Sequence, residues 1–285
     1  MAETKPASDP GTPERGAEDV PGLGIRRIEA AFEAARSEGR AALMPYMMAG
    51  FPGREAALEI ARAYADAGAD LVEIGVPFSD PLADGPVIHA AATAALERGA
   101  SLDDALRACE VLGEGVPAVA MCYVNMILAL GPRRFAGRLA KSGAAGAIVP
   151  DLPLEEAGEI RAALDEEGLA LVPLIAPTTP AERRRRICEA ARGFVYVVSD
   201  VGVTGERDEL PPRLSDLVAA TKEDTGLPVA VGFGIGTPQQ AATVGSVADG
   251  VIIGSRLVRA AGEAGNDAAA AVGSFLRETR DALAA

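Results

Sequence analysis

Glu73 and Asp84 are the residues of this sequence best placed for acid–base chemistry, and the stretch EIGVPFSDPLADGP at 73–86 contains both. Glu73 interrupts the apolar run LVEIG, where an ionised carboxylate is costly. An apolar setting raises the pKa of a carboxyl group towards neutrality, and such a group can donate and accept a proton near pH 7. The pattern therefore makes Glu73 a candidate general acid–base, with a buried, hydrogen-bonded structural acid as the alternative.

Asp84 lies further along the same stretch, in the segment LADGP. Asp-Gly is common turn chemistry, and an Asp ahead of a helix that starts at Pro86 also suits a cap. Pro77, Pro81 and Pro86 fix the backbone around it and lower the entropy cost of holding the carboxylate in one geometry. Asp84 is therefore a second candidate site residue, with a turn or capping role as the alternative.

Three further segments have the composition of a ligand site. Two are glycine-rich, GFGIGTP at 232–238 and VIIGSRLV at 251–258, and the second opens a helix. Exposed backbone N–H groups and a helix N-terminus favour phosphate, although ordinary glycine turns are the alternative. The third, SDVGVTGERDELPP at 199–212, is a long polar segment of the kind that closes over an active site, with a surface loop of no role as the alternative.

The elements that must position these residues alternate between short apolar runs and helical stretches. The runs are 42–49, 71–75, 118–123, 146–150, 171–176, 194–199, 228–233 and 250–254. The helical stretches are 54–67, 87–97, 102–112, 133–142, 155–167, 181–190, 214–225 and 238–244. The runs are almost continuously apolar, which is typical of strands covered on both faces.

Eight strand–helix units predict an α/β fold, the TIM (β/α)8 barrel, preceded by an extra N-terminal amphipathic helix in IRRIEAAFEAARSEG. A doubly wound sheet is the rival, but its glycine fingerprint follows the first strand, and here GFGIG follows the seventh. The junctions DAGADLVEIG, KSGAAGAIVP and GSVADGVIIG form a weak internal repeat. We expect residues 1–22 to be a disordered tail and residues 23–285 to form one barrel, with its active site at the carboxyl ends of the strands.

Composition excludes several classes of function. The net charge of −14 argues against nucleic acid as a partner. The first 22 residues lack the apolar centre of a signal peptide, and no apolar run has the length of a membrane helix. Three distant cysteines and a single histidine give no metal-ligand spacing, so we expect no metal and a reducing, cytoplasmic location.

Four motifs occur in order on the second, sixth, seventh and eighth runs: EIGVPFSDPLADGP, SDVGVTG, VGFGI and IIGS. Together they resemble the tryptophan synthase alpha subunit family from about Gly24 to Ala260. The resemblance implies retro-aldol cleavage of indole-3-glycerol phosphate to indole and glyceraldehyde 3-phosphate, in tryptophan biosynthesis and without a cofactor. It also implies that indole passes to a beta subunit, which carries pyridoxal phosphate, in an αββα tetramer.

The resemblance assigns roles to matching positions. It implies that Glu73 is the acid–base, that Asp84 binds the indole N–H, and that Tyr196 lines the site near the glutamate. The implied phosphate-binding residues are Gly205, Gly232, Gly234, Gly254 and Ser255, and the implied indole-pocket and loop residues are Tyr123, Phe233 and Thr204.

Two segments depart from the family pattern. Asp200, in SDVGVTG, adds negative charge near an anionic substrate, and YVNMI at 123–127 replaces the more usual YYNPI, in a loop that faces the beta subunit in the family. A stand-alone indole-3-glycerol phosphate lyase is therefore an alternative function. A catalytically idle homologue that only activates a beta subunit is another, although the intact Glu73 and Asp84 argue against it. Some other phosphosugar-binding barrel is the broader alternative.

Overall fold

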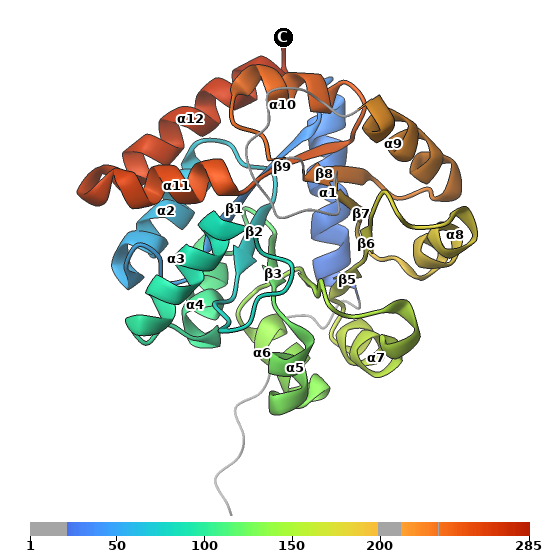
Figure 1. Cartoon of the computed structure of the whole chain (residues 1–285), viewed down its shortest axis with the longest axis horizontal. Coiled ribbons are helices and arrows are strands. Elements are labelled where there is room, and N and C mark those ends of the chain that lie inside the picture. Colours follow the sequence, from blue (N-terminus) through green and yellow to red (C-terminus); the bar gives the residue numbers. More distant parts are fainter. Residues whose placement is uncertain (1–21, 199–211, 233) are drawn as a thin grey trace, which may run out of the picture.

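A computed structural model describes residues 22–198, 212–232 and 234–285 of the chain (Figure 1). In these residues, parallel strands form a ring with helices outside it. The strands are β1 (Ala42–Met48), β2 (Val72–Gly75), β3 (Ala118–Met121), β4 (Gly146–Ile148), β5 (Ala170–Val172), β6 (Leu174–Ile175), β7 (Val195–Val198), β8 (Val229–Gly232) and β9 (Gly250–Ile253). Their order is β5-β4-β3-β2-β1-β9-β8-β7-β6.

The ring closes at the fifth predicted run, which the structure divides into β5 and β6. Pro173 separates the two parts, because proline has no N–H to donate to a neighbouring strand. Val172 of β5 pairs with Ile148 of β4, and Ile175 of β6 pairs with Val197 of β7. The two short strands therefore occupy one position of the ring, and the predicted (β/α)8 barrel is confirmed with its fifth strand interrupted.

Helices surround this ring and, apart from α1, cover its outer face. They are α1 (Leu23–Ser37), α2 (Arg54–Asp66), α3 (Pro86–Glu97), α4 (Leu102–Leu112), α5 (Val124–Leu130), α6 (Pro132–Lys141), α7 (Gly158–Glu166), α8 (Ala181–Ala190), α9 (Pro212–Asp224), α10 (Pro238–Gly245), α11 (Ser255–Glu263) and α12 (Ala268–Leu283), with 3-10 turns at Leu154–Glu156 and Gly265–Asp267. Helices α5 and α12 lie outside the predicted segments. For α5 the reason is its sequence VNMILAL, which continues the third apolar run without a break.

The N-terminal helix α1 closes the end of the barrel at which the strands begin. Its buried Ile28 and Phe32 belong to the core inside the ring, where Phe32 packs against Phe194 with ring centroids 5.6 Å apart. A Cβ at Gly24 would lie 2.6 Å from the carbonyl oxygen of Ala145, so this close approach requires glycine. With this end closed, the open mouth of the barrel lies at the carboxyl ends of its strands.

The repeated junctions form matching contacts before β2 and β9. Asp70 accepts the N–H of Leu43 at 2.7 Å, and Asp249 accepts the N–H of Val229 at 2.8 Å. In each case the carboxylate also pairs with a cation, Arg40 or Lys222. The internal repeat of the sequence therefore corresponds to a repeated link between neighbouring strands.

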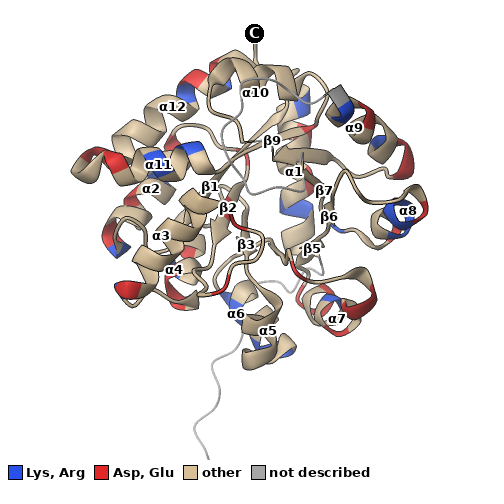
Figure 2. Cartoon of the chain, in the orientation of Figure 1, with Lys and Arg blue, Asp and Glu red and all other residues tan. Residues whose placement is uncertain are grey.

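Charged residues lie mostly on the outer helices, while the strands are largely uncharged (Figure 2). Within the described ranges, no helix combines the length and the hydropathy needed to span a bilayer. The predicted tail at 1–22 falls outside the described residues except for Gly22, and the predicted loop at 199–212 does so except for Pro212.

Candidate active site

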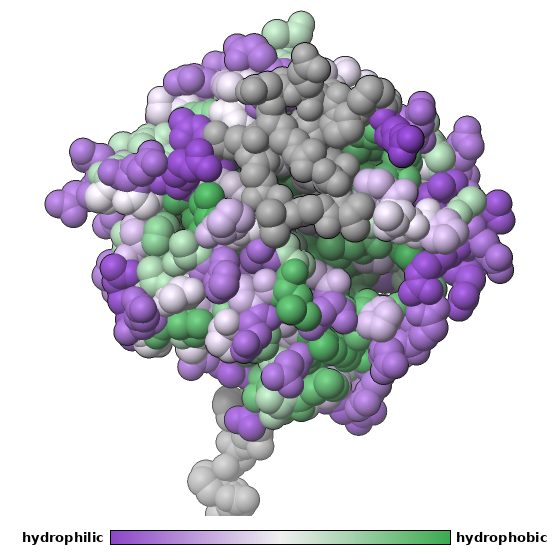
Figure 3. All heavy atoms as spheres, viewed as in Figure 1, coloured by the Kyte–Doolittle hydropathy of each residue, from purple (hydrophilic) through white to green (hydrophobic). Residues whose placement is uncertain are grey.

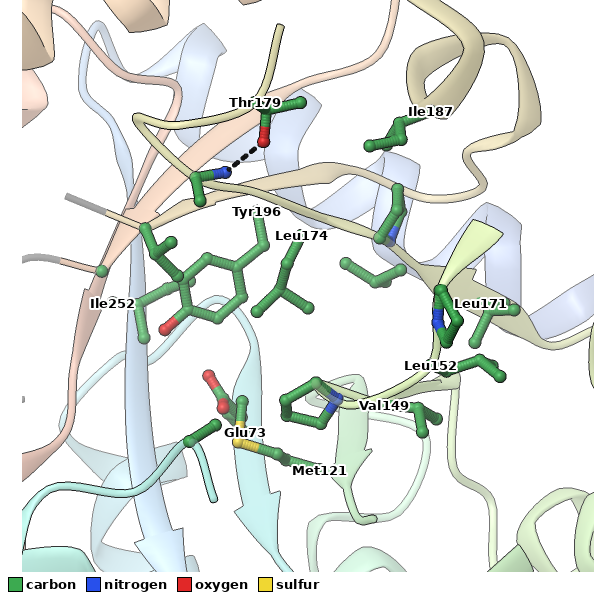
Figure 4. A pocket seen from close by; sticks show the side chains of 18 of the residues that line it. Glu73, Met121, Val149, Leu152, Leu171, Leu174, Thr179, Ile187, Tyr196 and Ile252 are labelled. Atoms are coloured by element: carbon green, nitrogen blue, oxygen red, sulfur yellow. Dashed lines mark hydrogen bonds between the residues drawn. The ribbon is translucent and has the colours of Figure 1, made fainter. Parts of the chain in front are cut away.

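Glu73 lies at the centre of β2 and points into the barrel. It pairs in register with Val119 of β3, whose side chain belongs to the core inside the ring. Residues in register on neighbouring strands share a face of the sheet, so Glu73 has the same orientation. Its side chain lines the cavity at the mouth of the barrel although the residue is only 1% exposed (Figure 4).

The surroundings of Glu73 favour the neutral carboxyl group. Its Oε2 is buried and makes no hydrogen bond in the described part of the chain. Burial raises the pKa of Glu73 to about 8, and the nearby charge of Asp84 acts in the same direction. A carboxyl group with this pKa holds a proton at neutral pH and can release it to a bound molecule, which is what a general acid–base requires.

Asp84 is held by Tyr123, which follows β3 and precedes α5. The Tyr123 hydroxyl donates to Asp84 Oδ1 at 3.0 Å and accepts the N–H of Ala83 at 3.1 Å. The Tyr123 ring stacks on Phe78, with centroids 5.2 Å apart. Burial raises the pKa of Asp84, and the hydrogen bond from Tyr123 opposes that shift. One tyrosine thus fixes the loop at two points and partly supports the ionised carboxylate.

Tyr123 itself is not among the residues that line the cavity. Tyr123 contacts Asp84, which does line the cavity. The predicted contact between Tyr123 and an indole ring stays a prediction. A sequence signal for this positioning role exists, because Tyr123 is a polar aromatic residue at the end of the third apolar run.

Two tyrosines line the inner wall of the cavity, and the sequence analysis identified only one of them, Tyr196 of β7. The other is Tyr46 of β1, a polar aromatic residue within the run ALMPYMMA. Burial raises the pKa of both hydroxyls well above the ordinary value for tyrosine, with smaller contributions from the Glu73 and Asp84 carboxylates. Both are therefore neutral phenols that can donate and accept hydrogen bonds.

The predicted phosphate-binding positions gather where β8 and β9 end, on the far side of β1 from Glu73. Gly232 ends β8, Gly254 follows β9, and Ser255 is the first residue of α11; all three line the cavity together with Gly234. A helix N-terminus carries a partial positive charge and free N–H groups, which suit an anion. The predicted site residues Gly205, Thr204 and Phe233, and the departure at Asp200, lie outside the described residues.

The cavity that joins these groups has a volume of about 590 Å³, which suits a small-molecule ligand. Figure 3 shows green apolar side chains deep in the hollow near the centre of this face. Besides the polar groups, the lining includes Met121, Pro150, Leu174 and Ile252, and it extends towards Ile187 of α8. The cavity therefore combines an apolar region, two carboxyl groups and a glycine-rich wall with an adjacent helix N-terminus. No cluster of His, Cys, Asp or Glu in the described ranges could hold a metal ion.

The fold and the site define the class of (β/α)8-barrel enzymes, with the active site at the carboxyl ends of the strands. A family model described as "Tryptophan synthase alpha chain" matches residues 32–284. A tryptophan synthase alpha chain of Synechococcus sp. (strain CC9902) is 47% identical over 255 residues, which cover 88% of this chain and 95% of that one. One of Carboxydothermus hydrogenoformans is 47% identical over 236 residues, covering 82% and 88% of the two chains.

Solved structures that resemble this chain also come from tryptophan synthases. A structure of Mycobacterium tuberculosis tryptophan synthase superposes with a TM-score of 0.85 at 38% identity, covering 91% of this chain and 98% of that one. A structure of tryptophan synthase subunit alpha from Legionella pneumophila gives a TM-score of 0.80 at 35% identity, covering 90% and 98%. The chain belongs to the tryptophan synthase alpha chain family, whose members are lyases that cleave indole-3-glycerol phosphate in tryptophan biosynthesis.

Proposed function

We propose that this chain cleaves indole-3-glycerol phosphate with Glu73 as both general acid and general base. The carboxyl group first gives its proton to C3 of the indole ring, which becomes an electrophilic indolenine cation. The resulting carboxylate then takes the proton of the hydroxyl on the carbon attached to C3. The bond between that carbon and C3 breaks, its electron pair restores the indole, and the three-carbon fragment leaves as an aldehyde. The observation that carries this proposal is the unpaired, buried carboxyl group of Glu73, whose pKa is raised to about 8.

Asp84 stabilises the positive charge that appears on the protonated indole ring. Its carboxylate accepts the ring N–H, an interaction that becomes stronger as the ring becomes cationic. Support comes from the hydrogen bond at 3.0 Å from Tyr123, which orients the carboxylate at the edge of the cavity. The two carboxyl groups then have separate roles, proton transfer for Glu73 and charge stabilisation for Asp84.

The glycine-rich wall binds the phosphate group of the substrate. Backbone N–H groups at Gly232, Gly234 and Gly254 and the hydroxyl of Ser255 are suited to the phosphate oxygens, and the N-terminus of α11 adds favourable charge. Gly205 is a further proposed ligand, and Thr204 a proposed support for Asp84. This wall fixes one end of the substrate, so that the indole ring lies in the apolar region of the cavity.

A beta subunit is the proposed partner, in an αββα tetramer, with pyridoxal phosphate on that subunit and no cofactor on this chain. Support comes from exposed apolar side chains close to the YVNMI segment, which faces the beta subunit in the family, and on the loop that Tyr123 holds. Leu82, beside Asp84, is 88% exposed, and Leu128 of α5 is 58% exposed. Tyr123 joins these segments through its bond to Asp84, which would couple the partner surface to the site. A cytoplasmic location belongs to the same proposal.

The first experiment incubates the purified chain with indole-3-glycerol phosphate and measures indole release, alone and with a beta subunit. We expect slow release that rises steeply with the partner. Fast release that the partner leaves unchanged would instead indicate a stand-alone lyase. No release under either condition would refute the proposal and favour the idle homologue. Asp200 and the YVNMI segment, the two departures from the family pattern, would then be the first positions to change to the family residues.

A further inference from the structure

Tyr46 lies on β1, between the strand of Glu73 and the strands that end in the proposed phosphate-binding residues. β1 lies between β2, which carries Glu73, and β9 and β8, whose ends carry the proposed phosphate-binding residues. A molecule that reaches from Glu73 to the glycine-rich wall must therefore cross β1. Tyr46 is the residue of β1 that lines the cavity, so it lies beneath the middle of such a molecule.

The aromatic side chain of Tyr46 extends from the end of β9 to β2, the two strands that flank β1. At its base, Cβ lies 3.7 Å from the position that a Cβ at Gly254 would occupy. At its tip, the hydroxyl oxygen lies over β2, where a Cβ at Gly75 would be only 1.9 Å away. Gly75 is two residues beyond Glu73 on the same face of β2, so the hydroxyl lies on the open side of Glu73.

The hydroxyl of Tyr46 has no protein partner among the described residues. Tyr46 is 5% exposed, and its hydroxyl makes no hydrogen bond within the described ranges. The backbone carbonyl of Tyr46 accepts a hydrogen bond at 3.0 Å from the hydroxyl of Tyr64, which lies on the outer side of the barrel. Tyr46 lines the cavity, and the burial of the residue keeps its hydroxyl protonated and ready to donate.

Tyr196 provides an internal comparison. Its hydroxyl leans over Gly232, where a Cβ would lie 2.3 Å away, so it is directed towards the proposed phosphate wall. The two tyrosines therefore lean in similar ways over glycines of the next strand, but their hydroxyls reach different parts of the cavity. The Tyr46 hydroxyl lies over β2, the strand of Glu73, and the Tyr196 hydroxyl lies over β8, although the charge of Glu73 also raises the pKa of Tyr196.

We propose that the Tyr46 hydroxyl binds the glycerol chain of the substrate by donating a hydrogen bond to one of its two hydroxyl groups. The inference rests on the proposed function and deepens it. The chain between the indole ring and the phosphate is flexible, and a fixed donor beneath it would select the conformation in which the hydroxyl to be deprotonated faces Glu73. Tyr46 would then distinguish the natural substrate from analogues that lack hydroxyl groups.

The test compares two ligands on Tyr46→Phe, which keeps the ring and removes only the hydroxyl. The ligands are indole-3-glycerol phosphate and an indole-3-propyl phosphate that lacks both chain hydroxyls, and all samples carry Glu73→Gln so that the substrate is not consumed. Titration calorimetry should show about tenfold weaker binding of the glycerol phosphate and less than about a twofold change for the propyl phosphate. In the otherwise wild-type enzyme, kcat/KM should fall about tenfold.

Tyr64→Phe is the matched control, because it removes a tyrosine hydroxyl that contacts Tyr46 from outside the cavity. It should leave the ratio of the two affinities unchanged. Equal weakening of both ligands by Tyr46→Phe would mean that the residue acts only through packing, and no weakening of either would mean that the hydroxyl does not reach the chain; both outcomes overturn the inference. Failure of the wild-type chain to release indole with a beta subunit present would refute the proposed function instead, before any variant is tested.

Discussion

Asp70 and Glu73 are two acids on the same short stretch of chain, yet they have opposite surroundings at the two ends of the barrel. Asp70, just before β2, receives the guanidinium of buried Arg40 at 2.5 and 2.9 Å and the N–H of Leu43 at 2.7 Å. Glu73, within β2, has one oxygen without a hydrogen bond in the described part of the chain and a pKa raised to about 8.

The difference shows what pairing does to a buried acid. The charge of Asp70 is matched by a cation and by N–H donors, so it contributes to the closed end of the barrel. Glu73 Oε2 has no such donor among the described residues, so its proton is held by the carboxyl group itself and is available to a ligand. Substitutions at the two positions should therefore affect different properties, stability at Asp70 and turnover at Glu73.

The largest expected effect is the loss of turnover in Glu73→Gln. The amide has the same shape but cannot transfer a proton, so indole release with a beta subunit should fall by at least about 10³-fold. Circular dichroism should show an unchanged fold, because Glu73 Oε2 makes no hydrogen bond to the described residues that the substitution would break. A variant that keeps more than about a tenth of the wild-type rate would exclude Glu73 as the acid–base.

Asp84→Asn should come next, with turnover lower by about 10²–10³-fold, the range for removing one preorganised charge. The amide can still occupy the loop, and the Tyr123 hydroxyl can still bond to it. The measurement is kcat under saturating substrate. An effect on KM alone would mean that Asp84 contributes to binding and not to the charge of the transition state.

Asp70→Asn should lower the free energy of unfolding by about 2 kcal/mol, because it leaves the buried guanidinium of Arg40 paired only with the more exposed carboxylate of Glu38. Urea unfolding measures this loss. The specific activity of the remaining folded protein should stay within about twofold of wild type, since the described partners of Asp70, which are Arg40, Leu43 and Arg280, do not line the cavity. A loss of turnover larger than the loss of folded protein would contradict the separation between the two acids.

The pH dependence of stability should identify Glu73 directly. With its folded pKa raised to about 8 from 4.5, the folded state holds a proton that the unfolded state has released. Stability therefore falls as pH rises between these values, by about 2 kcal/mol from pH 6 to 8. Glu73→Gln should remove this part of the dependence in urea unfolding across that range. Identical curves for the variant and wild type would mean that Glu73 ionises normally.

The smallest expected effect belongs to Tyr123→Phe, which leaves Asp84 and the loop but removes the hydrogen bond at 3.0 Å. Turnover near neutral pH should fall about tenfold. Because that bond lowers the pKa of Asp84, its loss should also move the acidic limb of the pH–rate profile to higher pH. A lower rate with an unmoved acidic limb would indicate that the hydroxyl only stiffens the loop.

Much of the fold could be predicted from local patterns. Continuous apolar runs separated by helical stretches predict the barrel, and Glu73 stands out because it interrupts such a run. The interruption of the fifth strand at Pro173 was not predicted, although proline is present in the run, because its effect depends on which neighbours the strand must pair with. Tyr46 was missed for a similar reason, because the apolar run around a tyrosine does not show whether its hydroxyl reaches the cavity or packs elsewhere in the fold.

The sequence by itself determined the order of strands and helices, because apolar periodicity and glycine positions are local properties of the chain. It also determined which residue types reach the mouth of the barrel. Only the tertiary structure decided which acid is paired and which is free. Arg40 reaches Asp70 from another part of the chain, and Tyr123 reaches Asp84 in the same way. Protonation depends on burial and on partners that folding brings together, so the chemistry of each acid is a property of the folded barrel.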